Sequence, residues 1–149
     1  MSLERSISKF KKPIGSGASR NAYYSRKYGV VVKMMKQFPD YFLGDQNQKE
    51  IELFEQMTPA ERKATPMLGH GIYKGKSYIV AERVTTFKKL GLSIPGFLDE
   101  PQFFSVKKVP EEYKTLFRVI KKYKICDVHP GNIGKTKDGR IVILDFGLT

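Results

Sequence analysis

Two short stretches near the C-terminal end decide how the sequence is interpreted: Ile125-Cys126-Asp127-Val128-His129-Pro130-Gly131-Asn132 and Asp145-Phe146-Gly147. Asp127 and Asn132 are five residues apart in a turn-rich segment, and Asp145 comes 13 residues later, at the end of an apolar run. Three oxygen-bearing side chains of this kind suit a Mg²⁺ ion together with a hydroxyl nucleophile. The alternative is a group of turn-forming residues, because Asp, Asn, Pro and Gly are common in loops.

A glycine-containing segment, Gly15-Ser16-Gly17-Ala18-Ser19, lies between two predicted strands at residues 10–14 and 21–25. Glycine lets backbone N–H groups approach phosphate oxygens closely, so the segment is a candidate phosphate-binding loop. By itself the pattern fits an ordinary glycine-rich β-turn better. The assignment as a phosphate-binding loop therefore depends on residues further along the chain.

Lys33 and Glu50 are the next candidates. The β-branched run at residues 29–35 predicts a buried strand that carries Lys33. A helix is predicted from the N-cap Asp45 to about residue 57, with Glu50 on the same face as its apolar residues. A strand lysine contacts the α- and β-phosphates of ATP when a carboxylate fixes its ammonium group. The sequence therefore predicts a pair between Lys33 and Glu50.

The remaining elements are read from capping, turn and periodicity signals. Thr58-Pro59 predicts the start of a short helix, and Lys74-Gly75-Lys76 predicts a hairpin turn between strands at 71–73 and 77–82. Residues 85–108 show no clear periodicity. A helix with one apolar face is predicted to open at Pro110, and a strand is predicted at residues 141–144 after the Asp138-Gly139 turn.

Composition restricts the class of protein. The 149 residues carry 27 basic against 15 acidic side chains, a formal charge of +12, which favours an acidic partner. The basic residues are scattered rather than interleaved with aromatic ones, so a nucleic acid is less favoured than ATP or an acidic protein. No apolar run approaches the roughly 20 residues that span a bilayer, so no membrane role is expected. The lone Cys126 fits a reducing, cytoplasmic setting.

These parts, in this order, resemble the protein kinase superfamily: a glycine loop, a strand lysine, a helix glutamate, a catalytic-loop Asp and Asn, and Asp-Phe-Gly. The resemblance covers residues from about 10 to 149. It implies that Ala81 is the gatekeeper, that Glu82 to Val84 hold the adenine edge, and that Ala22 and Val31 cover adenine. It also implies an α+β fold: an antiparallel-sheet N-lobe with one helix at about 1–84, and a reduced helical C-lobe at about 85–149, in one domain.

The sequence departs from the kinase pattern at three places. Arg20 replaces the third glycine of the loop, and Ile125-Cys126 replaces the His-Arg before the catalytic aspartate. His129 replaces a lysine and resembles the loop of small-molecule phosphotransferases, whereas the Asp-Phe-Gly favours a protein kinase. The sequence printed ends two residues after Gly147, before the segment that carries peptide substrates in an ordinary kinase.

The resemblance implies a phosphotransferase with ATP and Mg²⁺, most simply a serine/threonine protein kinase acting on a host or partner protein. Asp127, Lys33 and Glu50 would be catalytic, Asn132 and Asp145 would hold the metal, and Gly15 to Ser19 would cover the phosphates. The alternatives are a kinase-like binding module that inhibits its partner and a small-molecule kinase. Compactness favours a phage origin, and with it action in the host cytoplasm. Apolar surface left exposed on so short a chain would be covered by a homodimer or by the target protein.

Overall fold

A computed structural model gives the α+β fold of the chain and describes residues 3, 7, 10, 12–16, 20–36 and 45–146. The predicted loop residues Gly17, Ala18 and Ser19, and Gly147 after Asp145, lie outside these residues. The chain divides into two compact units. Unit 1 comprises Met1–Glu55 and Met67–Arg83, and unit 2 comprises Gln56–Pro66 and Val84–Leu148.

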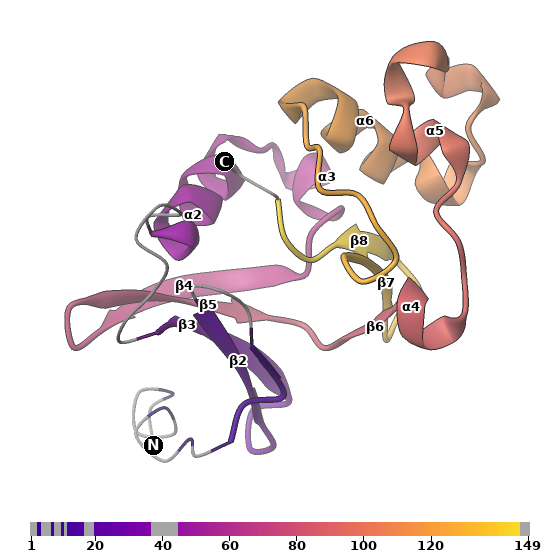
Figure 1. Cartoon of the computed structure of the whole chain (residues 1–149). Helices are drawn as coiled ribbons and strands as arrows, with labels where there is room; N and C mark the ends of the chain where they lie inside the picture. Colours follow the sequence, from indigo (N-terminus) through magenta and orange to yellow (C-terminus); the bar gives the residue numbers. More distant parts are fainter. Residues whose placement is uncertain are drawn as a thin grey trace. The chain divides into compact units, whose positions relative to one another are not determined.

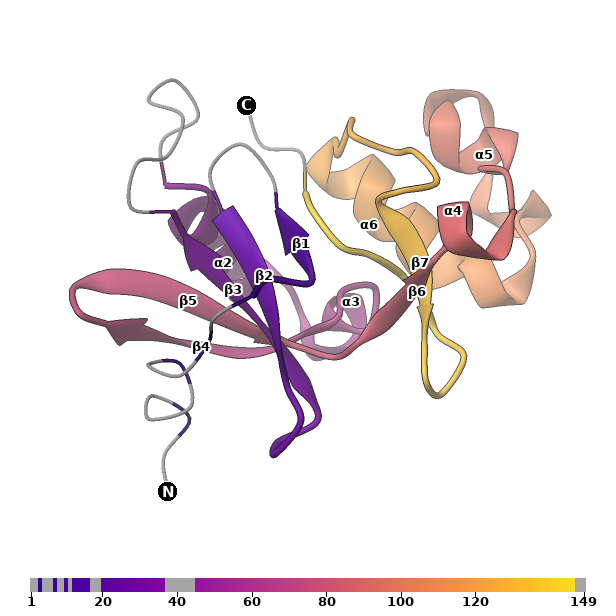
Figure 2. The same ribbon diagram turned by 60° about the horizontal axis from the view of Figure 1, so that its bottom comes forward.

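Unit 1 contains a five-stranded antiparallel sheet and the helix α2, as far as its residues are described (Figures 1 and 2). Its strand order is β1-β2-β3-β5-β4. The elements are β1 (Gly15–Ser16), β2 (Arg20–Ser25), β3 (Val30–Met35), α2 (Gln46–Gln56), β4 (Met67–Tyr73) and β5 (Lys76–Ala81). Lys74 and Gly75 have φ of 49° and 77°, so a tight turn of two left-handed residues joins β4 to β5.

The two faces of this sheet carry different apolar clusters. Ile51 and Phe54 of α2 pack with Met67 and Ile79 on one face. Ile7, Val32 and Tyr78 form the cluster on the other face. Because residues paired across strands share a face, the register of the strands assigns every other side chain of β2, β3 and β5 to the face that α2 covers.

Most predicted elements of unit 1 are confirmed. The strands at 21–25 and 29–35 and the helix after Asp45 appear within one or two residues of their predicted ends. The Asp45 side chain accepts a hydrogen bond from the Gln48 N–H at 3.0 Å, as an N-cap does. The strand predicted at residues 10–14 is wrong, because strand pairing begins only at Gly15, opposite Ala22.

Unit 2 combines a small antiparallel sheet, in the order β6-β7-β8, with short helices (Figure 1). Its strands are β6 (Val84–Thr86), β7 (Ile133–Thr136) and β8 (Ile141–Ile143). Its α-helices are α3 (Pro59–Arg62), α4 (Phe87–Leu90), α5 (Gly96–Asp99) and α6 (Lys114–Tyr123). Three 3₁₀ helices, η1 (Pro101–Phe103), η2 (Val106–Lys108) and η3 (Glu111–Tyr113), lie between α5 and α6.

The helix α6 supplies much of the core of unit 2. Leu116, Phe117, Val119 and Ile120 are buried, and the helix contacts both α3 and β8. The predicted apolar face is therefore confirmed, but the α-helix begins at Lys114, because the residues after Pro110 form the 3₁₀ helix η3. The predicted strand at 141–144 is also confirmed as β8.

The short helix α3 is held by the bonds of a single carboxylate, that of Glu61. Thr58 and Glu61 form a reciprocal capping box, in which the Glu61 carboxylate accepts the Thr58 N–H at 2.9 Å. The same carboxylate accepts the Tyr123 hydroxyl at 2.9 Å and forms an ion pair with Lys122 at 3.0 Å. The Thr58 N–H first, then Lys122, lowers the pKa of Glu61 from 4.5 to about 2.

This depressed pKa predicts how the stability depends on pH. A group whose folded-state pKa is lowered stabilises the fold above its unfolded pKa and loses that contribution as the pH falls through the folded value. We expect the melting temperature of Glu61→Gln to lie below wild type above pH 4.5, and the difference to shrink between pH 4.5 and about 2. Thermal unfolding across this range is the measurement, with the exposed Glu112→Gln as control. A difference that stays constant down to pH 2 would contradict the assignment.

Among the residues that the structure describes, none of the helices has both the length and the apolar character to cross a membrane.

Candidate functional site

The sequence-predicted nucleotide residues of unit 1 share one face of its sheet. Gly15 pairs with Ala22, and Ala22 pairs with Lys33, so these three form one row across β1, β2 and β3. Val31 pairs with Ala81 in the parallel row, two residues along β3. Because side chains two apart on a strand point to the same side, Ala22, Val31, Lys33 and Ala81 all lie on the face that carries α2.

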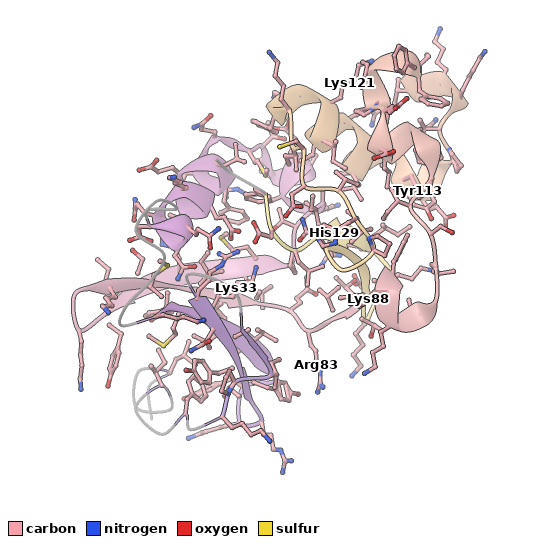
Figure 3. The ribbon with its side chains drawn as sticks, in the orientation of Figure 1. Lys33, Arg83, Lys88, Tyr113, Lys121 and His129 are labelled. Atoms are coloured by element: carbon pink, nitrogen blue, oxygen red, sulfur yellow. The ribbon has the colours of Figure 1, made fainter. Side chains whose placement is uncertain are left out.

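This face is apolar at Val31 and Ala81 and cationic at Lys33. Val31 and Ala81 are buried, whereas the Lys33 side chain is half-buried (Figure 3). At one edge, the Arg83 guanidinium lies over the Tyr24 ring, 4.6 Å from its centroid. A small apolar surface beside a strand lysine can accept a flat, uncharged ring next to an anionic group.

Glu50 pairs with Arg20 through both carboxylate oxygens. Arg20 Nη1 donates to Oε2 at 2.8 Å, and Arg20 Nη2 donates to Oε1 at 2.7 Å. The two side chains are only 9% and 4% exposed. The predicted partner of Glu50 was Lys33, so the observed pair differs from the prediction. Arg20 prevails because it is the first residue of β2 on the α2 face and presents two parallel donors to the carboxylate.

Asn47, one turn before Glu50, fixes α2 to the sheet. Its Nδ2 donates to the Lys33 carbonyl at 2.9 Å and to the Ser77 carbonyl at 2.9 Å. Its Oδ1 accepts from Arg20 Nη1 at 3.1 Å, and the residue is completely buried. Asn47 therefore links the backbone of β3, the backbone of β5 and the guanidinium that holds Glu50.

The remaining nucleotide candidates lie where β5 ends and β6 begins. Glu82 follows the last residue of β5 and is half-buried, and Val84 is the first residue of β6 in unit 2. The chain passes from unit 1 to unit 2 at Arg83–Val84. Ser16 belongs to β1, where its backbone pairs with Asn21.

In unit 2, Asp127 and His129 lie on the loop that follows α6, and about half of each side chain is exposed. Figure 3 labels His129 on this loop. Lys124, in the left-handed conformation at φ 53°, ends the helix and turns the chain into this loop. His129 Nε2 lies 3.4 Å from Asp127 Oδ1. His129 Nδ1 accepts the Gly131 N–H at 3.1 Å, which leaves the ring proton of the neutral imidazole on Nε2, facing the aspartate. The Pro130 carbonyl accepts the Lys88 N–H of α4 at 2.8 Å and anchors the loop.

Asn132 connects the Asp127 loop to the end of β8. Its Nδ2 donates to the Asp127 carbonyl at 2.6 Å and to the Asp145 carbonyl at 2.6 Å. Its own carbonyl accepts the Leu144 N–H at 2.9 Å. The residue is 4% exposed. These bonds bring three sequence-predicted residues, Asp127, Asn132 and Asp145, into one hydrogen-bonded arrangement.

The donor set suits a hard cation completed by further oxygen ligands. Among the described residues, no group of three His, Cys, Asp or Glu side chains forms a metal cluster. However, the Asn132 side-chain oxygen accepts no hydrogen bond from any described residue, although the residue is buried. A buried acceptor without a donor is costly, and a cation would satisfy it. Together with the half-buried Asp145, it can supply two of the oxygen ligands that Mg²⁺ takes.

Sequence reasoning missed two residues that position the site. Arg20 was noted only as a replacement for glycine, and Asn47 was not singled out. One signal for Asn47 was present in the sequence. Asn47 lies three residues before Glu50, so both residues share the apolar face of the helix, and a polar residue there is expected to be buried against the sheet. The Arg20–Glu50 pair joins residues that are 30 positions apart in the sequence, and no local sequence pattern predicts such a contact.

A scan against protein-family models finds no match to this chain, and a search of curated proteins finds no relative, so the interpretation of the site rests on its residues.

Proposed function

We propose that the chain is an ATP-dependent phosphotransferase that moves the γ-phosphate of Mg-ATP to a serine or threonine hydroxyl of a protein. The observation that carries the proposal is the Asn132 arrangement. One amide nitrogen holds the backbone of Asp127 and of Asp145, and the amide oxygen has no donor among the described residues. An amide oxygen of a buried residue that no described residue satisfies is a suitable ligand for a cation.

The face of the sheet in unit 1 supports the nucleotide half of the proposal. In this assignment, Ala22, Val31 and Ala81 contact adenine, and backbone groups of Glu82 and Val84 bind its edge. Backbone N–H groups of residues 15–19 cover the phosphates, and Lys33 contacts the α- and β-phosphates. The antiparallel sheet with the helix α2 is compatible with the nucleotide-binding part that the kinase resemblance implies.

Glu50 takes a modified role in this proposal. It holds Arg20 rather than Lys33, and Arg20 directly follows the candidate phosphate loop. The buried pair fixes the start of β2 against α2. Glu50 and Asn47 are therefore positioning residues, whereas Lys33 carries the positive charge that meets phosphate.

The chemistry itself is assigned to unit 2. Asp145 and Asn132 would hold Mg²⁺, which neutralises charge on the phosphate oxygens during transfer. Asp127 orients the attacking hydroxyl and accepts its proton as the oxygen bonds to the γ-phosphorus and ADP leaves. His129 Nε2–H faces Asp127 Oδ1 and leaves Oδ2 for the hydroxyl. Such catalysis depends mostly on positioning and charge neutralisation.

A small-molecule hydroxyl is the second candidate acceptor. It is favoured by the His129–Asp127 contact, because a histidine replaces the lysine that protein kinases carry at this position. The net charge of +12 favours an acidic protein instead. Both acceptors would use Asp127, so a substitution of this residue does not distinguish them. An assay of phosphate transfer to each acceptor does.

The test is transfer of labelled γ-phosphate from Mg-ATP to casein, to a bacterial lysate, and to aminoglycosides and nucleosides. Asp127→Ala is expected to lower transfer about 10²- to 10⁴-fold, because it removes the group that receives the proton. Asp99→Ala, an exposed carboxylate on α5, is the control and should transfer as wild type does. Equal transfer by Asp127→Ala and wild type would refute the assignment. ATP binding without transfer to any acceptor would favour the inhibitory binding module.

A further inference from the structure

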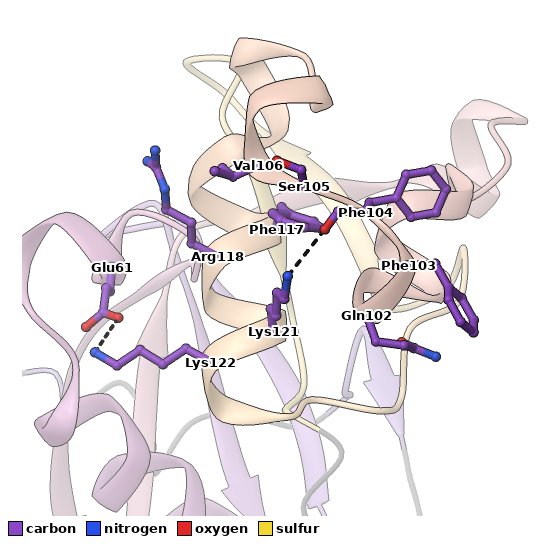
Figure 4. Close-up of a pocket in the computed structure, with 10 residues that line it drawn as sticks. All are labelled: Glu61, Gln102, Phe103, Phe104, Ser105, Val106, Phe117, Arg118, Lys121 and Lys122. Carbon is purple, nitrogen blue, oxygen red and sulfur yellow. Dashed lines mark hydrogen bonds and ion pairs between the residues drawn. The ribbon is translucent and has the colours of Figure 1, made fainter.

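A groove of about 790 Å³ lies on unit 2, on the side of α6 where η1 and η2 cross it (Figure 4). None of the residues assigned to phosphate transfer lines it. Its lining comes from α3, from α6, and from the segment that runs from η1 into η2.

The floor and one wall of the groove are apolar. Phe117 is buried beneath it, Val106 is half-buried, and Phe104 and Phe103 are 39% and 74% exposed. Two phenylalanines in sequence with this exposure are unusual on a protein surface, since such rings are normally buried. A concave site lined by them can bury an apolar side chain of a partner.

The rim of the groove is basic. Arg118, Lys121 and Lys122 project from one side of α6, and Glu61 is the single carboxylate among the lining residues. Glu61 already binds Lys122 and the Thr58 N–H, and its pKa of about 2 keeps it in that paired, ionised form. Lys121 Nζ donates to the Phe104 carbonyl at 3.3 Å and lies over the Phe117 ring, which fixes the wall against the helix.

Arg118 is the cation that a partner can engage. It is exposed, and no described residue forms an ion pair or hydrogen bond with it. Arg118 lines the groove, and Figure 4 shows its guanidinium extending outward from α6, on the opposite side of the helix from the Phe103 ring. Arginine at the edge of an apolar pocket is suited to bind a carboxylate through two parallel hydrogen bonds.

We propose that this groove is a docking site for an acidic peptide segment of a partner protein that carries a large aromatic or aliphatic side chain. The apolar side chain packs against Phe103, Phe104 and Val106, and a flanking carboxylate binds Arg118. The proposal concerns a different surface from the phosphotransfer residues and does not depend on them.

Two other occupants fit the groove less well. A single-stranded nucleic acid uses successive open aromatic faces. Of the three lining rings, Phe103 is largely exposed, whereas Phe104 is 39% exposed and packs edge-to-face against Phe97, and Phe117 is buried beneath Lys121. A second copy of the chain would bring another charge of +12 to a basic rim. Charge complementarity therefore favours an acidic segment.

Fluorescence anisotropy of labelled Glu-Glu-Phe-Glu-Glu-Leu-Glu with the full chain tests the proposal. The peptide Glu-Glu-Ser-Glu-Glu-Ser-Glu, which has the same charge, separates apolar docking from charge attraction alone. Arg118→Glu is expected to weaken binding of the first peptide by about tenfold, as loss of an arginine anchor does. Arg26→Glu makes the same charge change on an exposed arginine of unit 1 and should alter binding by less than about twofold at physiological salt.

Phe103→Ser tests the apolar half of the site. Its ring is 74% exposed, so the substitution should not unfold the protein, and a loss of about tenfold in affinity is expected. Ile72→Ser, whose side chain is 71% exposed on β4, is the control. Equal binding of both peptides, equal effects of Arg118→Glu and Arg26→Glu, or no binding would overturn the proposal. So would Arg118-dependent binding of oligouridylate that outcompetes the peptide, or a dimer in sedimentation that Phe103→Ser dissociates.

Discussion

Glu50→Gln is expected to lower the free energy of unfolding by about 3–5 kcal/mol, because it removes the negative charge that accepts two hydrogen bonds from the buried Arg20 guanidinium. Both oxygens of Glu50 accept hydrogen bonds from Arg20, and both side chains are almost fully buried. A glutamine keeps one acceptor oxygen but replaces the other by a donor that faces a donor. Such a loss is a large part of the roughly 5–15 kcal/mol that stabilises a typical domain.

Urea unfolding followed by circular dichroism is the measurement. Glu52→Gln, two residues away on the exposed face of α2, should change the free energy of unfolding by less than about 0.5 kcal/mol. The double substitution Arg20→Met with Glu50→Leu should recover part of the loss, since an apolar pair of similar volume avoids the buried charge.

The same unfolding measurement decides whether Arg20 or Lys33 is the ion-pair partner of Glu50. If Arg20 is its partner, Arg20→Met should destabilise the protein more than Lys33→Met, and Lys33→Met should mainly weaken ATP binding. The reverse order, with Lys33→Met the more destabilising and Arg20→Met close to wild type, would restore the pair that the sequence predicted.

Local signals account for the parts of the fold that were predicted correctly. Asp45 and the apolar face of α2 predicted that helix, and Thr58-Pro59 predicted α3. Both predictions succeeded because capping and helical periodicity depend on residues that are close together in the sequence. The run that forms β8 is continuous and β-branched, so its strand was visible without any partner.

The parts that were missed depend on distant partners. Strand β7, with Gly134 in its middle, has no alternating pattern and exists because β6 and β8 pair with it on both sides. The four-residue helices α4 and α5 are too short to show a period. Of the candidate site, the spacing of Asp127, Asn132 and Asp145 was readable in sequence, whereas the hydrogen bonds that make Asn132 central to them were not.

Asn132→Ala is expected to lower phosphate transfer by about 100-fold or more, because both carboxylate-bearing segments lose the bond that positions them. The change removes the donor to the Asp127 and Asp145 carbonyls while both aspartate side chains remain. It also removes the buried oxygen assigned to Mg²⁺, so half-maximal transfer should require a higher Mg²⁺ concentration. Initial rates across a Mg²⁺ titration measure both effects.

Asn132→Asp separates the two roles of this residue. An ionised aspartate offers oxygen to the cation but has no N–H to donate to the two carbonyls. If bracing of the loop dominates, Asn132→Asp should lose transfer nearly as fully as Asn132→Ala, whatever the Mg²⁺ concentration. If metal binding dominates, Asn132→Asp should keep most of its activity. Asn21→Ala, on the opposite face of the sheet in unit 1, should leave the Mg²⁺ dependence unchanged. Wild-type rates and Mg²⁺ dependence in both Asn132 variants would remove this residue, and the observation that carries the proposed function, from the mechanism.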